Sequence, residues 1–210
     1  MKINLIQPII FLDSLRLSYE YQSNISTSLN IYRLLCGEDV YTNALTLNNE
    51  LELILVGSHN NRNFFIGQKN RYWFDWEFAI HGITEAYSVT KLNNSCYVAV
   101  GRADNNIAVI SFDSHGVVLW VYTFSLREST CAYDVISTAD GGFLVVGSAF
   151  NIVYGYPSSP FLSKFSALGD LVWSRISSYD AEGRAVQELE NGDILMLANT
   201  KRRCLFFAKL

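Results

Sequence analysis

The sequence predicts an all-β fold built from four copies of one strand-rich unit, and three observations lead to this prediction. A stretch of sixteen residues recurs four times without a gap, and successive copies start 44, 46 and 51 residues apart. Each copy consists of an alternating segment, a polar turn and an apolar run, which is the pattern of a β-hairpin. No long helical periodicity interrupts the copies. A repeat of this length made of short strands is typical of a β-propeller, so we expect one blade per copy.

The four copies are the hairpins that we assign as the first and second strands of each blade. They are Thr42–Gly57, Ala86–Gly101, Ala132–Gly147 and Gly183–Ala198. In the third copy the turn is Asp140-Gly141-Gly142, and glycine accepts the positive φ that a primed hairpin turn requires. The other turns contain Asn48-Asn49, Asn93-Asn94 and Asn191-Gly192. Because asparagine also tolerates positive φ, all four predict the same kind of turn.

A second block follows each of the first three hairpins and predicts the third and fourth strands. The blocks are Phe64–Trp76, Ile107–Trp120 and Phe161–Trp173. Each block is an apolar strand, a polar turn and a strand that carries a tryptophan. We expect these tryptophans to fill the wedge between neighbouring blades, where their large area contributes most by burial. They are interpreted as core residues and not as ligand contacts.

The two ends of the chain supply the remaining parts of the last blade. Cys204–Leu210 matches a third strand, and no fourth strand follows it. Ile9–Tyr21 resembles a third and fourth strand without a hairpin before it. The simplest arrangement places residues 14–24 beside Cys204–Leu210, which closes four blades of four antiparallel strands and removes the exposed strand edges. A monomer is then favoured. Residues 1–12 would be a surplus strand, so a fragment of a larger ring is one alternative. Self-pairing into a larger ring is another, because a truncated ring would expose strand edges.

Composition fits a single propeller domain over residues 1–210. Half of the residues are hydrophobic and 14% are aromatic, which suits sheets packed face to face. The net charge of −4 and the scattered basic residues exclude the basic face of a nucleic-acid binder. No apolar run is long enough to span a membrane. Since residues 1–12 make a poor signal peptide, a cytoplasmic location is the default expectation.

Side chains that carry chemistry are sparse in this sequence. The four cysteines lack the CxxC spacing of a zinc or redox site, so we expect buried free thiols. The three histidines fall at different repeat positions, and no phosphate loop, Gly-x-Ser-x-Gly or HExxH motif occurs. We therefore expect no catalytic residue, no metal and no cofactor. The segment Ser111–Trp120 resembles the Asp-box of propeller hydrolases, and it motivates the alternative of a carbohydrate-binding or glycoside-hydrolysing propeller.

The third repeat resembles that of a known family. Ala132–Gly147 and Phe161–Trp173 combine the Asp-Gly-Gly turn with Lys164 and with the spacing from Gly169 to Trp173. The pattern is similar to the repeats of bacterial propeller proteins, many of them secreted and most without known activity, over about residues 42–210. It is more weakly similar to the tryptophan-docking repeats of quinoprotein dehydrogenases and of the outer-membrane barrel-assembly lipoprotein. The calcium and quinone ligands of those dehydrogenases are not found in this sequence. The resemblance implies a propeller, and secretion as the alternative location.

The connections at one end of the predicted blades vary most between the repeats. Variable loops on a rigid scaffold are where binding usually resides. The longest connection is Ser148–Pro160, and its tyrosines suit contact with a peptide or a glycan. The candidate contact residues on this loop face are Tyr154, Tyr156, His59, His81, Arg127 and Asp180. The sequence therefore predicts a non-catalytic module that recognises a protein, a peptide or a glycan.

Overall fold

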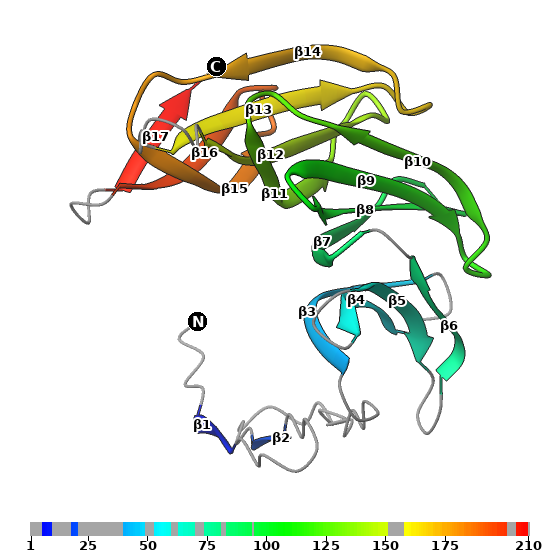
Figure 1. Cartoon of the computed structure of the whole chain (residues 1–210). Coiled ribbons are helices and arrows are strands. Elements are labelled where there is room, and N and C mark those ends of the chain that lie inside the picture. The colour runs from blue at the N-terminus through cyan, green and yellow to red at the C-terminus, as the bar shows by residue number, and fades with distance from the viewer. Residues whose placement is uncertain are drawn as a thin grey trace.

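The computed structural model describes residues 6–9, 18–20, 40–48, 53–59, 63–69, 74–80, 83–93, 95–150, 158–200 and 205–209. The regular structure in these residues is β-sheet (Figure 1). Three sheets have four antiparallel strands in chain order, a fourth has three strands, and a small N-terminal sheet has two. The all-β class that the repeats predict is therefore confirmed.

Four successive sheets correspond to the four repeats, and we number them as blades 1 to 4. Blade 1 contains β3 (Val40–Leu47), β4 (Leu53–His59), β5 (Asn63–Lys69) and β6 (Phe74–Ile80). Blade 2 contains β7 (Glu85–Lys91), β8 (Cys96–Ala103), β9 (Asn106–Asp113) and β10 (Val118–Phe124). Blade 3 contains β11 (Ser129–Ser137), β12 (Phe143–Phe150), β13 (Ser159–Phe165) and β14 (Leu171–Ile176). Blade 4 contains β15 (Ala181–Glu188), β16 (Ile194–Thr200) and β17 (Leu205–Lys209).

The blades follow one another along an arc (Figure 1). The first strand of each blade lies on the concave side, whereas β6, β10 and β14 lie on the outside. Neighbouring first strands contact each other, β3 with β7, β7 with β11, and β11 with β15. Residues at the same repeat position on these strands are therefore brought close together in space, although they are far apart in the sequence.

The described N-terminal residues form a separate strand pair. β1 (Ile6–Ile9) is antiparallel to β2 (Ser18–Glu20), with Ile6 opposite Glu20. The predicted pairing of residues 14–24 with the last strand is not present among the described strands, because β17 pairs with β16 and β2 pairs with β1. Within the described residues, blade 4 thus has three strands in place of the predicted four.

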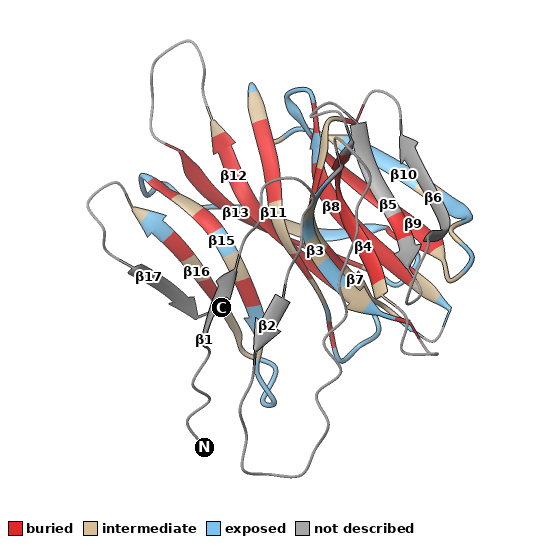
Figure 2. Ribbon diagram, turned by 90° about the horizontal axis from the view of Figure 1, so that it is seen from below, coloured by how far each residue is buried: buried red, intermediate tan, exposed pale blue. Residues whose placement is uncertain are grey.

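The hydrophobic core lies between the blades. In β8, Tyr97 and Ala99 pack toward blade 1, whereas Val98 and Val100 pack toward blade 3. This split arises because successive side chains of a strand point to opposite faces. Buried residues therefore concentrate on the middle strands of the blades (Figure 2). Full burial of one large apolar side chain contributes about 1.5–3 kcal/mol, so the blades are held mainly by their shared faces.

Two of the three repeat tryptophans occupy the predicted wedge between blades. Trp120 of blade 2 stacks on Phe143 of blade 3, with 6.3 Å between ring centroids, and packs against the core cluster of these two blades. Trp173 packs against the cluster between blades 3 and 4. The predicted packing role is thus confirmed for these two residues, while the side chain of Trp76 lies outside the described residues.

Each first strand has a β-bulge at the same repeat position. The pairing with the second strand skips one residue in every blade, namely Asn43, Tyr87, Tyr133 and Arg184. A bulge leaves the extra residue unpaired and re-aims its side chain. In blade 3, Gly147 lies opposite the bulge. A Cβ at this position would collide with the backbone of Cys131 and Ala132. This crowding explains the glycine that ends the first three copies of the repeat.

The turns at the opposite end differ from the primed turns that the sequence predicts. In blade 3 the amide of Gly141 donates to the carbonyl of Thr138, and the amide of Thr138 donates to the carbonyl of Gly142, both at 2.9 Å. This pattern is a type I turn followed by one left-handed residue. The single left-handed residue is Gly141, with φ of 84°. Asn93 in the blade 2 turn has no positive φ, and its side-chain oxygen instead accepts from the amide of Ser95.

Candidate functional site

The bulged residues of blades 2, 3 and 4 stack on one another along the concave side. The rings of Tyr87 and Tyr133 meet edge to face, with 5.4 Å between their centroids. The guanidinium of Arg184 lies 4.3 Å from the centre of the Tyr133 ring, within the range of a cation–π interaction. The row is thus continuous across three blades.

Asn43, the bulged residue of blade 1, extends the row by hydrogen bonds. Its side-chain nitrogen donates to the carbonyl of Ala86 at 2.7 Å and to the carboxylate of Glu85 at 3.1 Å. Every blade therefore contributes its bulged residue to one row. We call this row, made of Asn43, Tyr87, Tyr133 and Arg184, the bulge arc.

A carboxylate lies beside each end of the three stacked residues. The hydroxyl of Tyr87 donates to Glu85 at 2.7 Å, and Arg184 forms an ion pair with Glu182. Glu85 and Glu182 occupy the same repeat position, directly before the first residue of the second and fourth copies. The arrangement places hydrogen-bond acceptors around two aromatic rings and one cation.

Burial keeps the tyrosine hydroxyls of the bulge arc and the adjacent Cys131 thiol protonated. It raises the pKa of Tyr133 to about 12, and the neighbouring Cys131 adds to this effect while Arg184 opposes it. Burial, followed by the hydrogen bond to Glu85, also raises the pKa of Tyr87 well above its ordinary value. The pKa of the Cys131 thiol rises to about 11 through burial, although hydrogen bonding to Tyr133 and the charge of Arg102 oppose it. All three groups are therefore protonated and neutral at pH 7.

Asp134 connects blade 3 to both of its neighbours beside the arc. Its carboxylate accepts from the hydroxyl of Ser88 in blade 2 at 2.9 Å and from the amide of Val186 in blade 4 at 3.1 Å. It also accepts from the amide of Val135 at 2.9 Å. Because these donors lie on three different blades, Asp134 fixes the relative positions of the strands that carry the arc.

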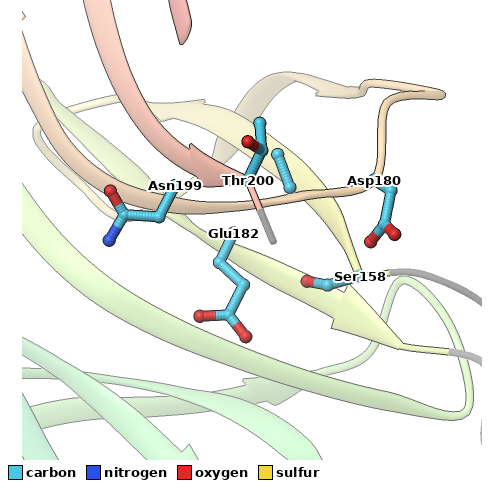
Figure 3. Close-up of a pocket in the computed structure, with 6 residues that line it drawn as sticks. Ser158, Asp180, Glu182, Asn199 and Thr200 are labelled. Carbon is cyan, nitrogen blue, oxygen red and sulfur yellow. The ribbon is translucent and has the colours of Figure 1, made fainter. Parts of the chain in front are cut away.

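A pocket adjoins each of the two carboxylates. The smaller has a volume of about 180 Å³ and is lined, among the described residues, by Ser158, Asp180, Ala181, Glu182, Asn199 and Thr200 (Figure 3). The larger has a volume of about 500 Å³ and is lined by Thr84, Glu85, Arg102, Asp104 and Asn105. Glu182 and Glu85 thus belong both to the surroundings of the arc and to a pocket wall.

The structure describes the side chains of two of the six predicted contact residues, Asp180 and Arg127. Asp180 is exposed and lines the smaller pocket. Arg127 is partly exposed between β10 and β11 and lines neither pocket. His59 is the last residue of β4, and its side chain lies outside the described residues. His81, Tyr154 and Tyr156 also lie outside them. The predicted loop Ser148–Pro160 is shorter than expected, because β12 extends to Phe150 and β13 begins at Ser159.

The bulge arc itself was not predicted from the sequence. The signal lies in the second residue of each copy, which is large or polar while its two neighbours are mostly small. This position can be recognised as a bulge only when the register between the first and second strands of each copy is known to the residue. The sequence pattern led to candidate contact residues in the loops and to none on the first strands of the blades.

The segment resembling an Asp-box is a turn at the other end of the blades. The carboxylate of Asp113 accepts from the amides of His115 and Val117, at 2.8 and 2.9 Å, and closes the connection between β9 and β10. In the described part of the chain, no group of three or more histidine, cysteine, aspartate or glutamate side chains could hold a metal ion. No helix within that part is long and apolar enough to cross a membrane.

Comparison with known proteins supports the architecture. No protein-family model matches the chain, and no curated protein matches it at a significant level. The fold is similar to the crystal structure of a protein of unknown function from Bacteroides caccae, with a TM-score of 0.54 and 14% sequence identity. The match covers 86% of this chain and 64% of that protein, so this chain spans about two thirds of its length. The two share an all-β, multi-sheet fold, and function must be argued from the site.

Proposed function

We propose that this protein is a non-catalytic binding module that recognises a protein, a peptide or a glycan at the end of the blades where the bulge arc and the two pockets lie. The observation that carries the proposal is the arc itself. Four bulges at one repeat position direct four side chains into a single row, and bulges recur beside functional sites because they re-aim side chains.

The chemistry of the arc supports binding over catalysis. Burial raises the pKa of Tyr133 in the bulge arc to about 12 and the pKa of the adjacent Cys131 thiol to about 11, so neither group is ionised near neutrality. A general base works best when its pKa lies near the operating pH, and a cysteine nucleophile must be a thiolate. Tyrosines offer large contact area and a polar tip at small cost in conformational entropy, which suits recognition.

A screen against two ligand classes tests this function. The full chain is applied to a peptide library and to a glycan array, and the best hit is titrated against the parent and two matched variants. We expect Tyr133→Leu to weaken binding at least about tenfold, as the loss of a central aromatic contact does. Tyr122→Leu, on the outer strand β10, should remain within about twofold of the parent.

The outcomes of this screen are distinct. Binding to neither class, or equal effects of the two variants, overturns the proposal. A panel of fluorogenic glycosides is run in parallel for the alternative of a hydrolysing propeller. Turnover that depends on the folded chain would show that the module is an enzyme.

We also propose that the four blades close into a propeller, with residues 14–24 as the fourth strand of blade 4. The support is that blades 1 to 3 have four strands each, while the described part of blade 4 has three. Closure would cover the free edge of β17, and a sheet edge is otherwise open to self-association. In this arrangement, residues 1–12 are a surplus segment that belongs to none of the four blades.

Thermal melting and light scattering test the closure. Deleting residues 1–24 should abolish the cooperative transition, because the loss of a strand exceeds the roughly 5–15 kcal/mol by which a domain is stable. The full chain should scatter as a monomer. A truncated chain that melts cooperatively within a few degrees of the parent contradicts the closure, and an obligate dimer favours the larger ring.

A further inference from the structure

The smaller pocket contains a buried hydroxyl that has no partner. Ser158 is only 5% exposed, and its Oγ has no hydrogen-bond partner among the described residues. The backbone of this residue is fixed, because its carbonyl accepts from the amide of Ala181 at 2.8 Å. Buried polar groups are almost always hydrogen-bonded, so an unpaired one at a pocket wall indicates a place for a ligand atom.

Two carboxylates lie on either side of this hydroxyl. Figure 3 shows Asp180 and Glu182 on the same side of β15, with the hydroxyl of Ser158 directed into the space between them. Asn199 and Thr200, from the end of β16, complete the polar lining. The walls come from blades 3 and 4, so the pocket exists only where the two blades meet.

These side chains have complementary hydrogen-bonding capacity. Carboxylates only accept, whereas the carboxamide of Asn199 and the hydroxyl of Ser158 can both donate and accept. A ligand with neighbouring hydroxyl groups can donate to the carboxylates and accept from the other two.

Charge and size narrow the ligand further. The ion pair with Arg184 already compensates the charge of Glu182, which favours a neutral, hydroxylated ligand over a cation. The volume of about 180 Å³ is below the range of about 300–1,000 Å³ in which drug-sized ligands bind. We infer that this pocket takes one sugar ring at the end of a glycan. The inference rests on the proposed binding function and names the ligand class of the same loop face.

The experiment uses a glycan array and then calorimetric titration with the methyl glycoside of the best hit. We expect Asp180→Asn and Ser158→Ala each to weaken binding about tenfold, which is what loss of one hydrogen bond to a charged or buried group produces. Asp170→Asn makes the same charge change in a turn at the other end of blade 3, and its affinity should stay within about twofold. Ser158→Ala should melt at or above the parent temperature without ligand, because the removed hydroxyl has no partner.

Each outcome decides a different statement. Sugar binding that the two pocket variants leave unchanged overturns the pocket assignment. Binding of peptides in the parallel library without binding of any sugar overturns the ligand class but leaves the proposed module intact. Failure to bind either class overturns both. A lower melting temperature of Ser158→Ala together with unchanged affinity would assign the hydroxyl a purely structural role.

Discussion

At the turn end of blade 3, the carboxylate of Asp140 accepts hydrogen bonds from three groups of its own blade, whereas Tyr133 near the other end contacts residues of blades 2 and 4. Asp140 binds the hydroxyl of Thr138, the amide of Gly142 and the ammonium of Lys164, at 2.6, 3.0 and 2.9 Å. Lys164 is largely buried and also donates to Thr138 and to the carbonyl of Phe165. The Asp-Gly-Gly turn and the lysine of the repeat are thus parts of one local network.

The arc end is organised between blades. Asp134 accepts from both neighbouring blades, Tyr133 stacks with both, and the buried hydroxyl of Ser158 has no partner in the part of the chain that the structure describes. The difference teaches that Asp140 acts within its own blade, while Tyr133 and Asp134 depend on how the blades are placed. The turn end also has contacts between blades, because the amide of Ala139 donates to Glu188 in blade 4 at 2.7 Å and the amide of Ser137 donates to Thr90 in blade 2 at 3.3 Å. We expect recognition to reside at the second end, because the bulge arc and the two pockets lie there.

The largest expected effect separates two glycines of the same hairpin. Gly147→Ala should cost about 3 kcal/mol or more, because the new Cβ would meet backbone atoms of Cys131 and Ala132 that cannot move independently. Gly141→Ala should cost only about 1 kcal/mol, because no atom lies within 4 Å and only the left-handed conformation is unfavourable. Urea denaturation of both variants measures the difference. Equal losses would mean that the bulge is not rigid.

Two aspartates of β11 and its turn provide the next comparison. Asp134→Ala should cost about 2–3 kcal/mol, because it leaves the amide of the buried Val186 without its acceptor in the neighbouring blade. Asp140→Ala should cost about 1 kcal/mol, since its side chain is 65% exposed and water can replace it. The free energy of unfolding of each variant is the measurement. A larger loss for Asp140 would reverse the proposed division between the two ends.

The contribution of Asp140 should depend on pH. The hydrogen bond from Thr138, followed by those from Lys164 and Gly142, lowers its pKa below the ordinary value of 3.8. A carboxyl group whose pKa is lower in the folded than in the unfolded chain stabilises the fold. This stabilisation is complete at a pH above the unfolded-state pKa and is lost as the pH falls from there through the folded-state pKa. The stability difference between the parent and Asp140→Asn should therefore be constant from pH 5 to 7 and shrink below about pH 3.8. A constant difference down to pH 2 would contradict the network.

The last prediction concerns the reactivity of the Cys131 thiol beside the bulge arc. Cys131 is 5% exposed, and burial raises its pKa from 9.0 to about 11, which lowers the thiolate fraction at pH 8 about 100-fold. Alkylation by iodoacetamide, followed by mass spectrometry of the folded chain, should label Cys131 at least about tenfold more slowly than the partly exposed Cys96. Comparable rates would show that the arc opens readily to solvent.

Local signals in the sequence determined the strands, the turns and the wedge residues. The alternation in Ala132–Gly147 and the apolar run after its turn predict a hairpin because side chains of a strand alternate between two faces. The position of Trp120 between blades followed from its place in the repeat. The turn type was less accessible, since the blade 3 hairpin has a type I turn followed by the left-handed Gly141 where a primed turn was predicted.

Only the tertiary structure decided the arc and the pockets. Tyr87, Tyr133 and Arg184 are separated by 46 and 51 residues, and they meet because bulges in neighbouring inner strands re-aim them toward one another. A shift of one residue in strand pairing would turn each side chain to the other face of its sheet, and composition carries no record of that register. The unpaired hydroxyl of Ser158 is likewise a property of where two blades meet, which no single repeat contains.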